Sequence, residues 1–119
     1  MYRIPENIDL SKAIGEFTTQ IHVGMFDIQF RFGDVSFSVQ SPIILLEGGK
    51  VIAKWEENTW PEKGFLRIFN VPIEKIEVPD DRTIILVFEG GVEMHLVDNS
   101  DQHESIQISI KDLPEPLII

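Results

Sequence analysis

The residues best suited to chemistry lie near the end of an apolar run and in the short polar segment that follows it. They are two imidazoles and three carboxylates, His95, Asp98, Asp101, His103 and Glu104. Imidazole nitrogens and carboxylate oxygens are ligands for zinc and similar divalent ions. The spacing matches no established metal motif, and the run from Asp98 to Asp101 lacks the glycine and ligand order of a calcium loop. Acidic residues and asparagine are also typical of ordinary turns. We therefore expect a solvated turn and no bound cofactor, with a metal site as the alternative.

A histidine beside a carboxylate could also act as a general base. A hydrolase needs in addition a nucleophile or a metal and an oxyanion site, and no segment of this sequence supplies them together. The Gly48-Gly49 and Gly90-Gly91 pairs lead into strand patterns rather than helices, so neither is a phosphate-binding loop. We expect a protein without enzyme activity. The alternative is a small metal-dependent protein or enzyme centred on His95 and His103.

The composition indicates a soluble globular protein. The chain has 119 residues, of which 43% are hydrophobic and 25% charged, and we expect residues 1–119 to form a single domain. There is no cysteine, which excludes disulfides, thiolate zinc sites and cysteine nucleophiles. The first residues show no apolar signal segment, and no apolar run approaches the length of a membrane span. We expect a cytoplasmic location.

The net charge of -10, from 20 acidic and 10 basic residues, limits the partners. Binding to phosphates needs clustered lysine and arginine, so the charge argues against nucleic acid and against anionic membranes. A basic protein partner would be attracted at long range. An acidic surface also serves solubility alone, and the charge does not by itself require a partner.

The centre of the predicted fold is a hairpin with strands Thr83–Phe88 and Val92–Val97 and a turn at Glu89-Gly90-Gly91. Because side chains alternate faces along a strand, one face is apolar and should be buried. The predicted cross-strand pairs on this face are Phe88 with Val92, Leu86 with Met94, and Ile84 with Leu96. The opposite face carries Ile85, Val87, Glu93, His95 and Val97 and should be partly wet.

Two further hairpins are predicted upstream. Strands 28–32 and 35–39 flank Gly33-Asp34, a two-residue loop typical of tight hairpins. The predicted pairs are Phe32 with Val35, Phe30 with Phe37, and Ile28 with Val39. Another hairpin joins 43–46 to 51–55 through Glu47-Gly48-Gly49-Lys50, and Ser41-Pro42 separates it from the preceding strand.

The remaining segments are less regular. Residues 8–20 predict a short amphipathic helix, or a helical turn followed by a strand, with Asp9 or Ser11 as the cap. Residues 61–69 fit either a helical turn or a short strand. Residues 73–78 predict a strand on or near a sheet edge, and Pro79-Asp80-Asp81-Arg82 predicts a turn.

The C-terminal part should contain one more strand and a tail. Residues 103–110 alternate as a half-buried strand, which we expect to be the third partner of the 83–97 hairpin. The tail, residues 111–119, contains two prolines, and its apolar end could dock on the core, cover a sheet edge, or form a homodimer. We therefore predict a mainly β fold (α+β at the margin), with antiparallel hairpins forming a sandwich, roll or partly open barrel and one short N-terminal helix.

Two tryptophans flank an acidic loop that could bind a basic protein. Trp55 ends a strand and should pack in the core, whereas Trp60 lies in the loop, before a proline. Aromatic side chains beside acids can form a hot spot for a basic partner. Glu56 and Glu57 are the acids of this loop.

The stretch from about Phe65 to Ile110 resembles that of small uncharacterised bacterial domains. The matching residues are Phe88, Gly91, Asp98 and Glu104-Ser105, and the chain departs from the pattern by having His103 where an aromatic is expected. The resemblance covers under half of the chain and carries no catalytic residue. Some domains of this group are thought to be immunity-type proteins, which bind and neutralise a toxin encoded nearby.

We therefore expect a non-enzymatic, immunity-like protein-binding module whose acidic surface faces a basic partner. The alternatives are the metal-dependent protein or enzyme described above, and a structural homo-oligomeric module that uses the C-terminal tail. The candidate partner-binding residues are Glu56, Glu57, Trp60, Glu93, His95, Asp98, Asp101 and Glu104.

Overall fold

The computed structural model describes residues 3–5, 8–99 and 105–119. These residues form ten strands and two short 3-10 helices, η1 (Ser11–Ala13) and η2 (Lys63–Ile68). In chain order the strands are β1 (Thr18–Val23), β2 (Ile28–Phe32), β3 (Val35–Val39), β4 (Ile43–Glu47), β5 (Lys50–Trp55), β6 (Ile73–Asp80), β7 (Thr83–Phe88), β8 (Val92–Val97), β9 (Ile106–Ile110) and β10 (Leu117–Ile118).

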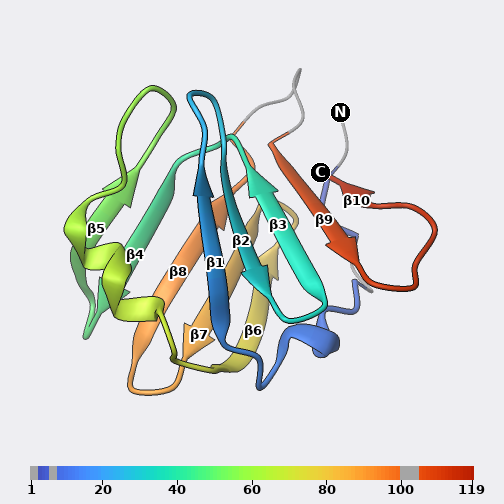
Figure 1. Ribbon diagram of the computed structural model, residues 1–119, viewed down its shortest axis with the longest axis horizontal. Coiled ribbons are helices and arrows are strands. Elements are labelled where there is room, and N and C mark those ends of the chain that lie inside the picture. Colours follow the sequence, from blue (N-terminus) through green and yellow to red (C-terminus); the bar gives the residue numbers. More distant parts are fainter. Residues whose placement is uncertain (1–2, 6–7, 100–104) are drawn as a thin grey trace.

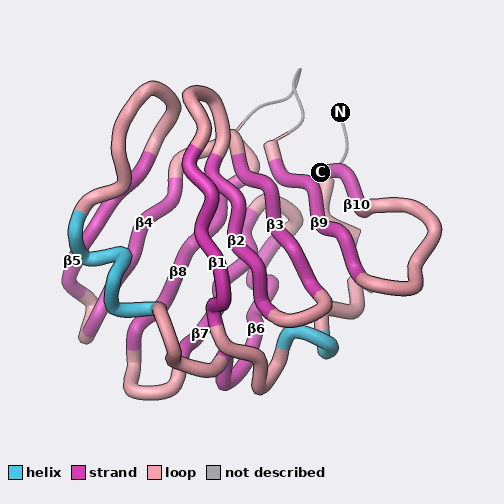
Figure 2. Tube along the Cα trace, viewed as in Figure 1, coloured by secondary structure: helices cyan, strands magenta, loops and turns pink. Residues whose placement is uncertain are grey.

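The strands form two open antiparallel sheets of five strands each, with the orders β1-β2-β3-β9-β10 and β5-β4-β8-β7-β6. Figure 1 shows the first sheet lying across the second, and Figure 2 shows how little of the chain is helical. The apolar faces of the two sheets share one core, in which the rings of Phe32 and Phe88 lie 6.2 Å apart. The prediction of a mainly β fold is confirmed, and among the predicted architectures the fold is a sandwich.

The predicted hairpin pairings are confirmed. In the β2–β3 hairpin Ile28 pairs with Val39, Phe30 with Phe37, and Phe32 with Val35. All six side chains are buried, because each strand alternates apolar and polar residues.

The β7–β8 hairpin is central in the second sheet, between β4 and β6. Leu86 pairs with Met94 and Ile84 with Leu96, as predicted. The predicted apolar face is fully buried, and the opposite face is half-buried. The predicted edge strand is also confirmed, because β6 ends this sheet. The predicted turn at residues 79–82 is too long: β6 continues through Pro79 and Asp80, which an edge strand tolerates, and the turn consists of Asp81 and Arg82.

The prediction that the strand after residue 103 joins the β7–β8 hairpin is wrong. Strand β9 lies in the first sheet, between β3 and β10. The free side of β8 is taken by β4, whose Leu45 pairs with Met94. Alternation along β9 indicates which side chains are buried, but it does not indicate which strand lies beside it.

The predicted N-terminal helix is only the single turn η1. Of the two predictions for residues 8–20, the helical turn followed by a strand is therefore the correct one. Gly15 has a φ of +86°, which cannot occur inside a right-handed helix, and its N–H donates to the Ile73 carbonyl oxygen at 2.7 Å. The predicted cap at Asp9 or Ser11 is wrong: Leu10 is the N-cap residue of η1 and no side chain caps the turn, although Asp9 Oδ1 accepts the Ser11 N–H at 3.0 Å just before it. The hydrogen bonds from the Ser11 side chain and backbone hold the pKa of Asp9 below its ordinary value.

Residues 61–69, for which both a helical turn and a strand were open, contain the 3-10 helix η2. Its Phe65 and Ile68 are buried in the core. Gly64 lies against β5 so closely that a Cβ atom there would be 2.6 Å from the Ile52 carbonyl oxygen. The helix therefore closes the side of the sandwich next to β5.

The C-terminal tail covers the edge of the first sheet. Strand β10 pairs with β9, and Ile119 is buried. The Ile119 carbonyl oxygen accepts N–H groups from Ser105 and Ile106, and its own N–H donates to the Ile106 carbonyl oxygen. Three roles were open for the tail. The structure shows two of them, because the tail docks on the core and covers a sheet edge. No helix in the described part of the chain is long and apolar enough to span a membrane.

Candidate interaction surface

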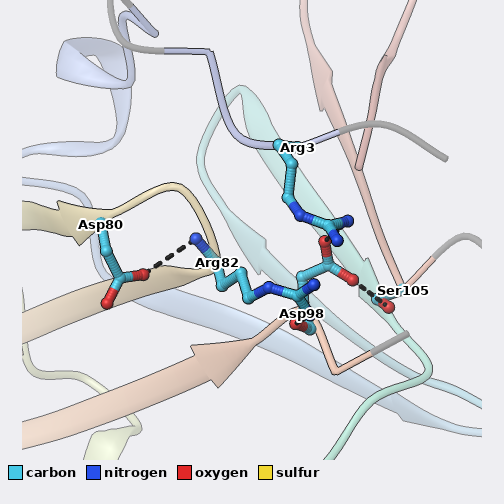
Figure 3. Close-up of polar contacts among 5 residues, drawn as sticks. All are labelled: Arg3, Asp80, Arg82, Asp98 and Ser105. Carbon is cyan, nitrogen blue, oxygen red and sulfur yellow. Dashed lines mark hydrogen bonds and ion pairs between the residues drawn. The ribbon is translucent and has the colours of Figure 1, made fainter. Parts of the chain in front are cut away.

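Asp98, a candidate in the predicted polar turn, is fully buried. Its Oδ1 accepts a hydrogen bond from Ser105 Oγ at 2.8 Å, and its Oδ2 lies 3.3 Å from Arg3 Nη1 (Figure 3). Its backbone N–H donates to the Arg82 carbonyl oxygen, and Arg82 Nη1 donates to the Asp98 carbonyl oxygen. Asp98 therefore connects the N-terminal segment, the β6–β7 turn and the start of β9. It does not present its carboxylate to a partner.

Three more members of that predicted cluster lie within residues 100–104, which the structure does not describe. Asp101, His103 and Glu104 fall in this gap, so the proximity of His95 to His103 stays a prediction. Among residues 3–5, 8–99 and 105–119, no group of three or more His, Cys, Asp or Glu side chains is placed to hold a metal ion.

Glu93 and His95 lie on the half-buried outer face of β8, as predicted. His95 Nε2 is 3.0 Å from Glu93 Oε1. His95 sits between Ile44 on β4 and Ile85 on β7 in the ladder, and Glu93 between Leu46 and Val87. The pair is thus a polar contact within a mostly aliphatic face.

The acidic loop is held in place by short hydrogen bonds. Thr59 Oγ1 donates to the Glu56 carbonyl oxygen at 2.7 Å and accepts the Glu56 N–H at 3.1 Å. The Asn58 N–H donates to the Met25 carbonyl oxygen at 2.9 Å, which joins this loop to the β1–β2 loop. Figure 1 shows the two loops side by side at one end of the sandwich.

The two tryptophans have different roles, as expected. Trp55 is buried, and Trp60 is 78% exposed. Glu56 and Glu57 are also exposed. Of the predicted candidates, these three therefore lie together on one accessible loop.

Trp60 belongs to a larger apolar surface that the sequence analysis did not identify. Met25 is 67% exposed and Leu66 is 62% exposed. These side chains border two adjoining hollows that share Trp60 and Val23, one of about 430 Å³ and one of about 370 Å³. We call this the Trp60 surface, defined by six residues: Ile21, Val23, Met25, Trp60, Leu66 and Phe69.

A sequence signal exists for two of these six residues, Leu66 in η2 and Phe69 directly after it. The segment contains two adjacent apolar pairs, Phe65-Leu66 and Ile68-Phe69. In a helix with three residues per turn, positions three apart lie on the same side. When Phe65 and Ile68 are buried, Leu66 and Phe69 must face outward. The contribution of Met25 and Val23 depends on how the loops meet, which the sequence does not reveal.

Comparison of the chain with protein-family models, with curated proteins and with solved structures found no match. The resemblance to small bacterial domains is neither supported nor contradicted by this result.

Proposed function

We propose that this protein is a non-enzymatic binding module that recognises a basic protein partner through the Trp60 surface. The observation that supports this most directly is the exposed Trp60 ring beside the exposed Met25 and Leu66 side chains. A contiguous exposed apolar patch with polar residues around it is typical of a protein interaction site. Tryptophan is also among the residues most enriched at binding hot spots.

The charge of the chain favours a basic partner. Residues 56–64, which include Trp60, contain three glutamates and one lysine, and the whole chain carries a net charge of -10. Such a field accelerates the encounter with a positively charged protein and slows the encounter with an acidic one. The resemblance to immunity-type domains points in the same direction, since the partner would then be a toxin with a basic surface.

The test uses the products of the reading frames on either side of this gene, purified and titrated against the full chain by calorimetry. We expect one basic product to bind, with an association rate that falls steeply as salt is added. Trp60→Ala should weaken the complex by about 2 kcal/mol or more, the range of a hot-spot aromatic.

Leu113→Ala is the matched control. Leu113 is 52% exposed, but it lies in the β9–β10 loop, on the other side of the molecule from η2 (Figure 1). It should leave the affinity unchanged. Failure of every neighbouring product to bind, or equal loss of affinity in both variants, would contradict the proposal.

A further inference from the structure

The outer edge of β1 has backbone groups that point toward solvent. Successive residues of a strand direct their N–H and C=O groups to opposite sides, so one hydrogen bond fixes the direction for the whole strand. The Gly24 N–H donates to the Asp27 carbonyl oxygen, within the β1–β2 hairpin. His22 and Gln20 therefore face β2, and Val23 and Ile21 face outward.

Contacts at both ends of β1 agree with this direction. The Met25 carbonyl oxygen faces outward and accepts the Asn58 N–H at 2.9 Å. At the other end, Thr18 forms a bridge with Phe69 after a shift of register near Thr19. The open part of the edge is thus the segment around Ile21 and Val23, and no described strand lies beside it.

The larger hollow lies directly against this open segment. Ile21 and Val23 form one wall, and Trp60, Leu66 and Phe69 form the other, around a volume of about 430 Å³. An extended peptide placed along β1 would bond to the outward N–H and C=O groups of Ile21 and Val23. Its alternate side chains would point into the apolar hollow, since side chains in a strand alternate faces.

We propose that the basic partner binds by adding a short extended segment to the edge of β1, with alternate apolar side chains in the hollow. This inference rests on the proposed function and specifies its binding mode. Strand addition of this kind takes its affinity from backbone hydrogen bonds and its specificity from pockets for alternate side chains. The segment that fits between the Met25 and Thr18 contacts is about three to five residues long.

Charge distinguishes this occupant from a second copy of the chain. Pairing two β1 edges would bring two chains of net charge -10 together. A segment with lysine or arginine at its ends would instead be attracted by the negative net charge of the chain and by Glu62, which lines the hollow beside Lys63. The partner segment is therefore expected to be apolar at alternate positions and basic at its ends.

The test uses a synthetic peptide in which valine and threonine alternate between terminal lysines, added to the isotopically labelled full chain at millimolar concentration. Amide hydrogen exchange of Ile21 and Val23 should slow by about tenfold or more, whereas Gln20 and His22 should change little. The same peptide N-methylated at alternate amides, or with glutamate in place of lysine, should bind at least about tenfold more weakly.

Two variants of Val23 distinguish the contribution of its backbone N–H to binding from that of its side chain. Val23→Pro removes an outward N–H that no described neighbour accepts, and proline is tolerated at such an edge position. Val23→Ala shortens the side chain and keeps the N–H. Both should fold, which the amide spectrum would verify, and Val23→Pro should weaken peptide binding by a larger factor than Val23→Ala, which loses only side-chain contact with the hollow.

The outcomes separate this inference from the proposed function. Peptide shifts at Trp60 and Leu66 without protection of Ile21 and Val23 would overturn strand addition and leave the Trp60 surface as a binding site. A dimer in sedimentation that dissociates in Val23→Pro would identify a second copy as the occupant and overturn the basic segment. Absence of any shift at millimolar peptide would also overturn strand addition, and the neighbouring gene products would still test the proposed function independently.

Discussion

The buried carboxylate of Asp98 accepts hydrogen bonds from groups that are distant in the sequence. It contacts Arg3 and Ser105, while its backbone contacts Arg82 (Figure 3). Removing this carboxylate leaves the Ser105 hydroxyl, which is buried, without its acceptor. The consequence is a loss of stability at a position remote from the Trp60 surface.

Asp98→Ala should lower the free energy of unfolding by about 1–3 kcal/mol, the cost of leaving a buried donor unsatisfied. Arg3 is partly exposed and can be hydrated, so the larger cost of a fully buried unpaired charge does not apply. Urea denaturation measures the change. Glu57→Ala, at an exposed carboxylate, should change stability by less than about 0.5 kcal/mol. Equal effects of the two substitutions would contradict the structural role of Asp98.

A second prediction at the residue scale concerns the free protein. Amide exchange should be faster at Ile21 and Val23 than at Gln20 and His22 by about tenfold or more, because only the latter donate to β2. Exchange measured by NMR without any ligand provides the check. Slow exchange at all four amides would show that the outward groups of β1 are already bonded.

The sequence predicts which apolar side chains are buried better than it predicts the burial of a polar side chain such as Asp98. Asp98 follows an apolar strand and precedes asparagine and serine, a pattern typical of a solvated turn. Its burial depends on Arg3 and Ser105, whose approach is a consequence of the folded chain. Trp60 was identifiable because it lies in a polar loop before a proline, where no apolar periodicity predicts burial.

At the scale of elements, η2 positions Leu66 of the Trp60 surface and leads directly into Phe69, and its packing depends on Gly64. A Cβ atom at this position would be 2.6 Å from the Ile52 carbonyl oxygen and 2.8 Å from Ala53 Cβ. Neither neighbour is the end of a flexible side chain, so the helix itself would have to move away from β5.

Gly64→Ala should therefore lower the free energy of unfolding by about 1–3 kcal/mol, the usual cost of overpacking. It should also shift the resonances of Leu66, which lies in η2, and of Phe69, which follows it directly. Lys63→Ala, an exposed substitution one residue away, is the control and should have little effect on either measurement. If Gly64→Ala is as stable as the parent, the close approach of η2 to β5 is not important for folding.

Hairpins were predictable because the required information is local. Gly33-Asp34 sets the register of β2 and β3, and the alternation of Phe30 and Phe37 with polar residues sets the buried face. The position of β9 was not predictable in the same way. Its isoleucines fit the inner face of either sheet, and their alternation does not reveal that Ile108 lies opposite Phe37 of β3.

At the scale of the whole molecule, the tail is part of the sandwich. Ile119 lies in the core and exchanges backbone hydrogen bonds with Ile106, more than 10 residues earlier in the chain. Shortening the tail should therefore lower the stability of the folded chain, whether or not the chain forms a dimer.

Ile119→Ala should lower the free energy of unfolding by about 2–4 kcal/mol, because it leaves a cavity in the core. Leu113→Ala, in the exposed part of the same tail, should change it by less than about 0.5 kcal/mol. Chemical denaturation and sedimentation measured together distinguish the two roles of the tail. A change of mass without a change of stability would support a homodimer through the tail instead.

The hydrogen bond between Asn58 and Met25 and the bridge between Phe69 and Thr18 have a further consequence. A long unprotected edge strand is a template for runaway stacking of identical chains into fibrils. Here the two contacts occupy the ends of the edge and leave only a short central part accessible. A long, flat strand from another chain would collide with the loops that make these contacts. The same geometry that would admit a brief segment of the proposed partner thus disfavours stacking of identical chains at this edge.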